Sequence, residues 1–359
     1  MKVLYITPGY HPRIGGVEYV VKSVAERLVA RGHDVTVVAG EPGLSSLQEG
    51  ELNGVEVIRW PTYSPGNAYH FPIMRSKLRE LLLEKLKRCD VVHLHSVHSV
   101  FTIYALTIVK DCYVHTVLTP HYHGTGHTPF RKMLWIPWKS VVLKNIRHVD
   151  LVHTVSAYES RLVKEDFGVG SIVVEHGVEG WIKGVEWDPE NYVLYAGRIE
   201  RYKNIGRLSR IVKTLNNTYG LDLELKVIGN GSYREELIKR LNELGIAYEI
   251  SSFKRYQEYI DVLSKALVLA NISQREAFGL TINEANAIGV PAVAARPWGE
   301  HFINRNRTLV VNPGESDMAI AAKIMRFLEE CKKQPKSEVP SWDQVVDTYI
   351  KDLYHSTER

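Results

Sequence analysis

Residues 192–219 read YVLYAGRIERYKNIGRLSRIVKTLNNTY, and this stretch shows the structural step that the chain repeats. The short apolar run Tyr192–Ala196 is typical of a buried strand, and Asn204–Tyr219 is typical of a helix. A strand that passes through a short loop into a helix predicts one step of a parallel sheet covered by helices.

The same alternation extends in both directions from this stretch. Further strands are expected at Lys2–Ile6, Val35–Ala39, Val55–Arg59, Val91–His95, Tyr113–Thr119, Leu151–Val155, Leu223–Ile228, Tyr248–Ser251, Leu267–Ile272 and Ala292–Ala295. Further helices are expected at Val17–Arg31, Met74–Arg88, Tyr233–Leu244, Tyr256–Lys265, Thr281–Ile288 and Trp342–Tyr354. A polar break at Asp188–Asn191 separates two series of strands, so the chain is predicted to be an α/β protein with two doubly wound domains.

Length and composition agree with two globular domains. The chain has 359 residues, of which 45% are hydrophobic and 24% charged. No run approaches the ~18 apolar residues of a membrane span, and the start lacks the apolar segment of a signal peptide. Cys89, Cys112 and Cys331 form neither a disulfide framework nor a zinc pattern. We therefore expect a cytoplasmic protein, and a net charge of +4 gives no support to nucleic-acid binding.

Gly15 and Gly16 lie between the first predicted strand and the first predicted helix. Without Cβ atoms their backbone can approach a ligand closely, and amides at a helix N-terminus favour an anion such as phosphate. A glycine pair before a helix more often marks only a tight turn, so this loop is a weak signal by itself.

Two cations, Arg198 and Lys203, follow the strand at Tyr192–Ala196. Ligands of doubly wound sheets bind at the carboxyl ends of strands, where Arg offers a fork and Lys a point charge to phosphate. The alternative is that both are solvated surface cations. Gly229 and Gly231 follow the next strand, but the third glycine of the dinucleotide fingerprint is missing, which counts against NAD.

The most informative stretch is SQREAFGLTINEA, residues 273–285. Glu276 lies in the loop and Glu284 one turn inside the following helix, with Phe278-Gly279-Leu280 between them. Carboxylates accept hydrogen bonds from sugar hydroxyls, and exposed amides at a helix start donate to oxygens. The stretch therefore fits a hydroxyl-rich anionic ligand, although acids near a helix N-terminus are also common without one.

These residues, followed by Gly289-Val290-Pro291-Ala292-Val293, resemble the signature of the retaining group 1 glycosyltransferases, which are glycosyltransferase family 4. Other motifs occur in the order of that family: Gly15-Gly16, Thr119-Pro120-His121, Ser156, Gly177-Val178, Gly197-Arg198 with Lys203, and Gly229-x-Gly231. The resemblance covers almost the whole chain. It implies the GT-B architecture, in which two Rossmann-like domains face each other across a cleft and a C-terminal helix crosses back to the first domain.

The resemblance also implies roles for domains and residues. Residues 1–175, completed by 341–359, would bind the acceptor, and 176–340 would bind the nucleotide sugar. Arg198 and Lys203 would bind the donor diphosphate, and Glu284 the ribose hydroxyls. Glu276 and the amides of Phe278, Gly279 and Leu280 would hold the sugar, and His121 would face it from the other domain. Gly16 would approach the diphosphate, and Gly15, Gly229 and Gly231 are expected in the same site.

The expected reaction is transfer of a hexose from a UDP or GDP sugar to an acceptor hydroxyl with retention of configuration, without a cofactor. Arg198 and Lys203 would take the place of a metal ion, because no D-x-D motif follows a suitable strand. Departures from the family pattern at Tyr122, His176, Ala277 and Arg296–Glu300 leave the sugar and the acceptor open. A nucleotide-sugar epimerase of the same fold, an NAD oxidoreductase and a non-catalytic sugar-binding protein are the alternatives.

Two further patterns have competing interpretations. His93 and His95 share one strand face and could form a zinc site with His98, but polar strand ends that line the ligand cleft fit them better. Residues 130–148 read FRKMLWIPWKSVVLKNIRH, in which five basic residues alternate with apolar and aromatic ones. This segment fits either an anionic membrane surface on the inner face of the plasma membrane, with a lipid-linked or phospholipid acceptor, or a core helix with basic solvent positions.

Overall fold

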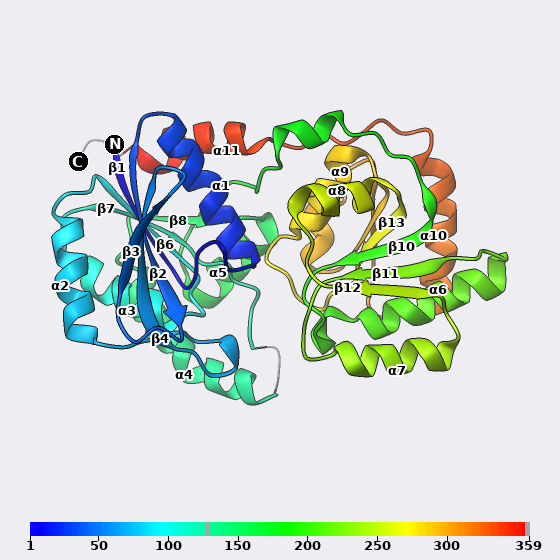
Figure 1. The fold of residues 1–359 in the computed structure, drawn as a ribbon, viewed down its shortest axis with the longest axis horizontal. Coiled ribbons are helices and arrows are strands. Elements are labelled where there is room, and N and C mark those ends of the chain that lie inside the picture. The colour runs from blue at the N-terminus through cyan, green and yellow to red at the C-terminus, as the bar shows by residue number, and fades with distance from the viewer. Residues whose placement is uncertain (127–128, 356–359) are drawn as a thin grey trace. The chain divides into compact units, whose positions relative to one another are not determined.

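The structure is a computed structural model of the chain, and it describes residues 1–126 and 129–355. The chain divides into two compact units. Unit 1 is Met1–His176 together with Trp342–Arg359, and unit 2 is Gly177–Ser341. Each boundary differs by one residue from the expected domain limits. Figure 1 shows the last part of the chain, in red, packed beside the first helix, in blue.

Among its described residues, unit 1 contains a nine-stranded sheet in the order β3-β4-β2-β1-β6-β7-β8-β9, with β5 paired to β4. The strands are β1 (Lys2–Thr7), β2 (Asp34–Pro42), β3 (Gln48–Leu52), β4 (Val55–Tyr63), β5 (Phe71–Pro72), β6 (Val91–His95), β7 (His115–Thr119), β8 (Leu151–Thr154) and β9 (Ile172–Val173). Only β3 and β5, of the strands described, pair antiparallel, both with β4. The strand order reverses between β1 and β6, which makes the carboxyl ends of these two strands the expected ligand edge of unit 1.

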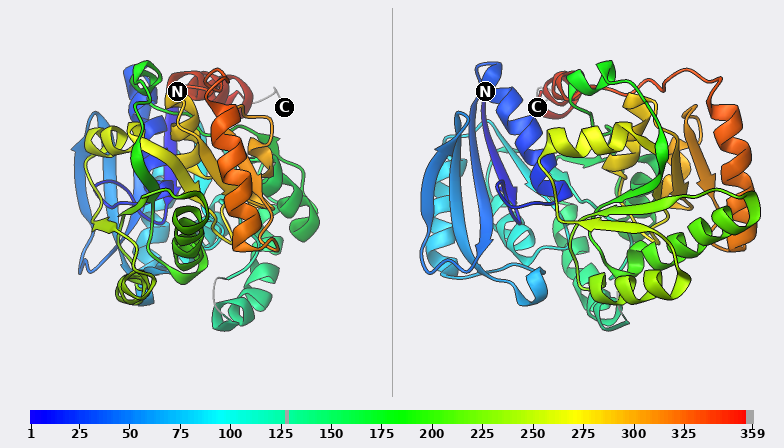
Figure 2. Two further views of the ribbon diagram at one scale, coloured as in Figure 1. Left: turned by 90° about the vertical axis from the view of Figure 1, so that its right-hand side faces the viewer. Right: turned by 45° about the vertical axis from the view of Figure 1, so that its right-hand side comes forward.

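Helices cover both faces of this sheet (Figures 1 and 2). They are α1 (Gly16–Ala30), α2 (Arg75–Leu86), α3 (Val100–Val109), α4 (Pro129–Ile146), α5 (Ala157–Phe167) and α11 (Trp342–Thr348), with a short 3-10 turn at Pro65–Asn67. The core consists of apolar side chains from the sheet and from α2, α3 and α4, such as Ile6, Leu78, Phe101 and Val142. Because helices cover both faces of the sheet, the central strands are buried at nearly every residue and do not alternate between buried and exposed side chains.

The last segment of the chain is bound to the sheet of unit 1 by a chain of hydrogen bonds. Nε2 of His153 must donate to the Val174 carbonyl (3.0 Å), so Nδ1 of His153 accepts from the Thr119 hydroxyl (2.7 Å). Thr119 in turn accepts from Nε2 of His93 (2.7 Å), and Nδ1 of His93 accepts from the Tyr354 hydroxyl (2.8 Å). Burial lowers the pKa of both histidines, that of His153 to about 4, so both rings are neutral and each proton has one place.

This anchoring also explains a difference from the expected final helix at Trp342–Tyr354. The α-helix ends at Thr348, and Tyr349–Tyr354 continue as a π-helix. The π-helical residues bond to the sheet of unit 1: His115 donates to the Leu353 carbonyl (2.7 Å), and the Tyr354 hydroxyl bonds to both His93 and Tyr5.

Within the described residues, unit 2 contains a six-stranded sheet, parallel throughout, in the order β12-β11-β10-β13-β14-β15. Its strands are β10 (Glu190–Ala196), β11 (Glu224–Ile228), β12 (Tyr248–Ser251), β13 (Ala266–Asn271), β14 (Ala292–Ala295) and β15 (Thr308–Val311). Its helices are α6 (Ile205–Tyr219), α7 (Arg234–Leu244), α8 (Tyr256–Ser264), α9 (Leu280–Ile288) and α10 (Asp317–Cys331), with 3-10 turns at Gly180–Gly184, Arg201–Lys203 and Trp298–Phe302. In Figure 1, α8 and α9 lie on one face of the sheet and α6 and α7 on the other.

The strand order of unit 2 reverses between β10 and β13. In a doubly wound sheet, the carboxyl ends of the two strands at this reversal border the ligand site. The loops that leave them are 197–204 after β10 and 272–279 after β13. These two loops contain the cations and the first carboxylate that the sequence singled out.

Candidate functional site

Lys203 and Glu276 are joined at the switch point of unit 2. Nζ of Lys203 donates to a carboxylate oxygen of Glu276, and Nδ2 of Asn271 donates to the same oxygen (3.1 Å). The side chains of Lys203 and Glu276 are only 9% and 19% exposed. An ion pair with so little access to water is well ordered and requires both partners, because either charge alone would be poorly solvated.

Arg198 lies on the same loop but is exposed. It donates to the hydroxyl of Tyr202 (2.7 Å), and the Tyr202 ring also lies 5.1 Å from Nζ of Lys203. Tyr202 therefore stands between the two cations and makes both more ordered than free surface cations would be. Tyr202 was not among the predicted site residues, although it belongs to the loop that contains Arg198 and Lys203.

Gly229 and Gly231 bring the loop after β11 against the loop after β10. A Cβ on Gly229 would lie 1.9 Å from the Gly197 carbonyl oxygen, and a Cβ on Gly231 would lie 2.2 Å from the Ile199 carbonyl oxygen. Gly229 also has φ of 152°. The two glycines are therefore required by the packing of adjacent strand-end loops, whether or not a ligand also approaches them.

The turn before α9 leaves backbone amides available to a ligand. Gly279 has φ of 107° and no side chain caps this helix. A Cβ on Gly279 would lie 2.7 Å from the buried Trp298 ring, so glycine is needed for both conformation and packing. The ring of Phe278 is buried and stacks on His301 at 5.0 Å, so only the backbone of Phe278 could contact a ligand. Amides at the start of α9, including those of Gly279 and Leu280, are suited to oxygen atoms of an anion.

Glu284 has different surroundings from Glu276. It is 5% exposed and accepts hydrogen bonds from the hydroxyls of Tyr256 (3.0 Å) and Tyr259 (2.9 Å) on α8. Burial raises its pKa to about 7, and the two tyrosines act in the opposite direction. The Glu284 carboxylate has two further lone pairs, which can accept hydrogen bonds from hydroxyl groups of a ligand. The spacing of three between these tyrosines on one helix was the available sequence signal for them.

The remaining predicted residues lie in unit 1. Gly15 precedes α1 in extended conformation and Gly16 begins the helix, but the space a Cβ on Gly15 would take is occupied by the Glu18 carboxylate, 2.2 Å away. His121 follows β7, is 9% exposed and has φ of 48°. Its Nε2 lies 3.0 Å from Nδ1 of His95, and burial lowers its pKa to about 3.

The three histidines considered for zinc separate into two groups. The rings of His93 and His95 are 4.3 Å apart, on one strand face as expected, whereas His98 stacks on His123 at 4.4 Å. Both nitrogens of His93 are used in the hydrogen-bond chain described above. Residues 1–126 and 129–355 contain no group of three or more His, Cys, Asp or Glu placed to hold a metal ion.

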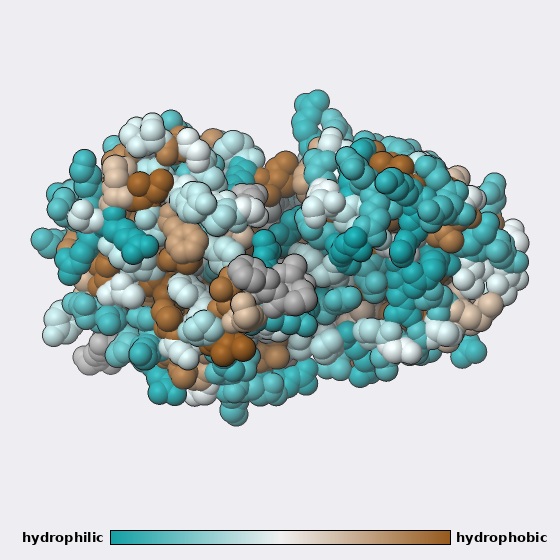
Figure 3. Space-filling model, turned by 90° about the horizontal axis from the view of Figure 1, so that it is seen from below, coloured by the Kyte–Doolittle hydropathy of each residue, from teal (hydrophilic) through white to brown (hydrophobic). Residues whose placement is uncertain are grey.

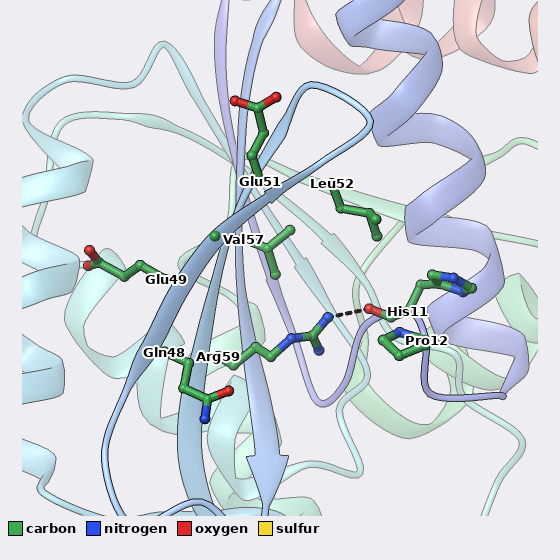
Figure 4. A pocket seen from close by; sticks show the side chains of 9 residues that line it. His11, Pro12, Gln48, Glu49, Glu51, Leu52, Val57 and Arg59 are labelled. Atoms are coloured by element: carbon green, nitrogen blue, oxygen red, sulfur yellow. Dashed lines mark hydrogen bonds between the residues drawn. The ribbon is translucent and has the colours of Figure 1, made fainter.

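A pocket in unit 1 lies away from all of these residues. It is lined by residues of β3 and β4 and by His11 and Pro12. Figure 4 shows the Arg59 guanidinium directed at the His11 carbonyl, to which it donates, while Glu49 and Glu51 point away. The pocket contains none of the residues predicted from the sequence.

Comparisons with known proteins assign the chain to a family. Residues 14–179 match Glycosyltransferase Family 4, and residues 179–337 match Glycosyl transferases group 1. A GDP-mannose:cellobiosyl-diphosphopolyprenol alpha-mannosyltransferase of Xanthomonas campestris is 22% identical over 391 residues, covering 99% of this chain and 97% of that protein.

Solved structures show the same fold. Sucrose-phosphate synthase from Thermosynechococcus elongatus has a TM-score of 0.72 at 18% identity, covering 99% of this chain and 95% of that one. HepE of Anabaena, solved with UDP and glucose, has a TM-score of 0.71 at 15% identity, covering 99% and 100%. The chain therefore belongs to the group 1 glycosyltransferases and has the GT-B fold.

Proposed function

We propose that the chain transfers a hexose from a nucleoside diphosphate sugar, with UDP or GDP as the nucleotide, to an acceptor hydroxyl with retention of configuration. The observation that carries the proposal is the meeting of Lys203 and Glu276 at the β10–β13 switch point. This pair offers one group for a phosphate and one for sugar hydroxyls within a single ordered site.

The proposed roles follow from charge and accessibility. As the bond from the sugar to the diphosphate breaks, negative charge grows on the diphosphate, and Arg198, Lys203 and amides at the start of α9 stabilise it. The new bond forms to the acceptor oxygen, and the acceptor proton passes to the leaving phosphate. Glu276 binds sugar hydroxyls and is not a covalent nucleophile. Two cations supply the charge, so no metal ion is required.

Glu284 is assigned to the ribose. Its buried carboxylate is held by two tyrosine hydroxyls and can accept two more hydrogen bonds. Gly229 and Gly231 would border the nucleotide from the loop beside it. The roles expected for Gly15, Gly16 and His121, in unit 1, stay predictions.

Binding and product analysis test the proposal. Calorimetric titration with UDP, GDP and ADP should give binding for UDP or GDP, and Arg198→Ala should weaken it about 10- to 150-fold through loss of a charge-assisted contact worth roughly 1.5–3 kcal/mol. Arg201→Ala is the matched control, because Arg201 lies on the same loop but pairs with Glu236. Absence of binding by all three nucleotides contradicts the proposal. NMR of the product gives the anomeric configuration, and full activity in EDTA is expected.

The acceptor is proposed to be lipid-linked or a phospholipid, reached at an anionic membrane surface. The name of the Xanthomonas relative specifies a diphosphopolyprenol-linked acceptor. In this chain, α4 has an outward face with large apolar side chains: Met133 is 58% exposed and Ile136 71%. Lys132 and Lys144 are exposed beside them. In Figure 3, brown hydrophobic side chains interrupt the teal surface on the part of the view that belongs to unit 1.

The two tryptophans of residues 130–148 contact the core of unit 1 and are not available to a membrane. Trp135 is 8% exposed in the core, and Nε1 of Trp138 donates to the Val97 carbonyl (2.9 Å). Lys139 is paired with Asp166. The helical period therefore separates residues 130–148 into a core face and an outward face, and only the apolar and basic side chains of the outward face are available to a membrane. None of the helices that the structure describes is long and apolar enough to cross a bilayer.

Flotation with vesicles tests this second part. Vesicles that contain anionic phosphatidylglycerol should carry the protein, and neutral phosphatidylcholine vesicles should carry much less. Ile136→Ser should reduce binding, whereas Ile303→Ser, at an equally apolar residue that is 55% exposed in unit 2, should not. Equal flotation of both variants, or none of the wild type, contradicts membrane attachment through α4.

A further inference from the structure

The carboxyl ends of β6 and β7 form a strained and tightly bonded edge in unit 1. The Ser96 amide donates to the Thr119 carbonyl and the Val97 amide to the Pro120 carbonyl, both at 2.9 Å. Ser96 and His121 have φ of 75° and 48°, which is the left-handed region that residues with a Cβ rarely adopt. Non-glycine residues in this region cluster at ligand sites, and β6 borders the switch point of this sheet.

His121 is held at this edge through both its ring and its backbone. Its ring stacks on that of His95, with centroids 5.3 Å apart and planes 27° apart, and Nε2 of His121 lies 3.0 Å from Nδ1 of His95. The next amide, that of Tyr122, donates to Glu159, whose side chain is fully buried. The position of the His121 ring is therefore fixed before any ligand binds.

The proton between the two rings has two possible places. Burial lowers the pKa of His95 well below its usual value and that of His121 to about 3, so each ring carries one proton. Nε2 of His95 is buried and has no hydrogen-bond partner among the residues that the structure describes. A buried N–H without an acceptor is rarer than a buried lone pair without a donor. The His95 proton is therefore on Nδ1, from which it donates to Nε2 of His121.

This assignment determines the chemistry of the outer nitrogen. With Nε2 of His121 accepting from His95, the single His121 proton is on Nδ1. No hydrogen-bond partner of that atom is found in residues 1–126 or 129–355, and the His121 residue is 9% exposed, so Nδ1 can still bond to a ligand. A neutral N–H group donates a hydrogen bond and cannot take a proton there.

We propose that His95 is a positioning residue that holds His121 in the tautomer with its proton on Nδ1, so that His121 offers a hydrogen-bond donor to an oxygen of a ligand at this edge of unit 1 and cannot take up a proton there. That this ligand is a substrate rests on the proposed function. The tautomer itself does not, because it follows from the geometry of unit 1 alone.

Long-range ¹H–¹⁵N correlation spectra of the protein labelled with ¹⁵N-histidine, recorded without ligand, test the assignment. His121, identified by the signals lost in His121→Asn, should show a protonated Nδ1 and a bare Nε2. His95→Phe should remove this preference and lower kcat/KM about tenfold. His95→Asn, whose amide can occupy the place of Nδ1, should restore both. His98→Gln is the matched control, because His98 stacks on His123 instead.

Each result has one meaning. A proton on Nε2 of His121 in the wild type, a charged ring at pH 7, or an unchanged tautomer in a folded His95→Phe variant overturns the proposal. Melting curves establish that the variants are folded, and the wild-type spectrum still tests the tautomer of His121 if His95→Phe does not fold. The expected tautomer without binding of any nucleoside diphosphate would contradict the proposed function and leave the assignment of His95 intact.

Discussion

Replacing Lys203 with methionine should destabilise unit 2 and weaken donor binding by separate routes. The change leaves Glu276 with the Asn271 amide as its remaining described partner. Removing one member of a buried ion pair typically costs about 3–5 kcal/mol, and the 19% exposure of Glu276 reduces this to roughly 2–3 kcal/mol. For a unit of this size the melting temperature should fall by about 4–12 °C.

The double variant separates the ion pair from phosphate binding. Glu276→Gln removes the charge that Lys203→Met leaves unpaired, so the combined variant should be at least ~1 kcal/mol more stable than Lys203→Met alone. Donor binding should recover less, because the phosphate contact of Lys203 is still absent. Scanning calorimetry resolves the transitions of the two units, and titration with UDP or GDP measures binding.

Two outcomes of the calorimetry would contradict the assigned role of the ion pair. If Lys203→Met melts like the wild type, the pair contributes nothing to the folded state of unit 2. If Lys203→Met and the double variant are equally destabilised, the cost lies in the lost packing of the lysine chain and not in an unpaired carboxylate. Unchanged nucleotide affinity in both variants would remove Lys203 from the donor site.

Three other variants test separate features. Gly231→Ala places a Cβ 2.2 Å from the Ile199 oxygen and should cost about 1–3 kcal/mol in calorimetry, while Gly184→Ala, with no atom within 4 Å, should cost much less. Burial raises the pKa of Glu284 to about 7, so the stability contributed by the protonated side chain is present at low pH and is lost as the pH rises from about 4.5 through 7. A ligand hydroxyl favours the ionised carboxylate, so the affinity for a nucleotide sugar should fall by up to about tenfold per pH unit below pH 7. Glu284→Gln should abolish this pH dependence in titrations. Tyr354→Phe leaves Nδ1 of the buried His93 without its donor and should cost about 1–3 kcal/mol by denaturant unfolding, whereas Tyr113→Phe, at a fully exposed tyrosine, should have no effect.

The sequence predicts the central strands well because they are short, apolar and followed by helices. Val91–His95, Tyr248–Ser251 and Ala292–Ala295 have the bounds that were expected. β3 was missed because QEGEL is polar and mostly exposed, so its pairing with β4 depends on the neighbouring strand and not on its own pattern. For α10 a signal was present and unused: Ser316 caps the helix through its side chain, and Ile320, Ile324 and Leu328 follow at helical spacing.

The candidate site could be located from the sequence but its contacts could not. Strand-end loops follow from the alternation of elements, which predicts Arg198, Lys203 and Glu276 at the carboxyl ends of the unit 2 strands, where the structure has them. That Lys203 pairs with Glu276 depends on the order of β10 and β13, which brings together residues 73 apart. The tyrosines on Glu284 and the tautomer of His121 depend on side-chain positions between elements, for which hydrophobic periodicity carries no information.

The division of the chain has a consequence for biosynthesis. A ribosome makes the whole of unit 2 before it makes Trp342–Tyr354, yet Tyr349, Leu353 and Tyr354 are buried in unit 1. Unit 1, most of which is translated first, therefore has an uncovered patch of sheet until the last residues are made. Unit 2, which is translated second, can already reach its native state. A stalled nascent chain that lacks only these last residues should bind chaperones through unit 1, although every nucleotide-binding residue proposed in unit 2 has by then been synthesised.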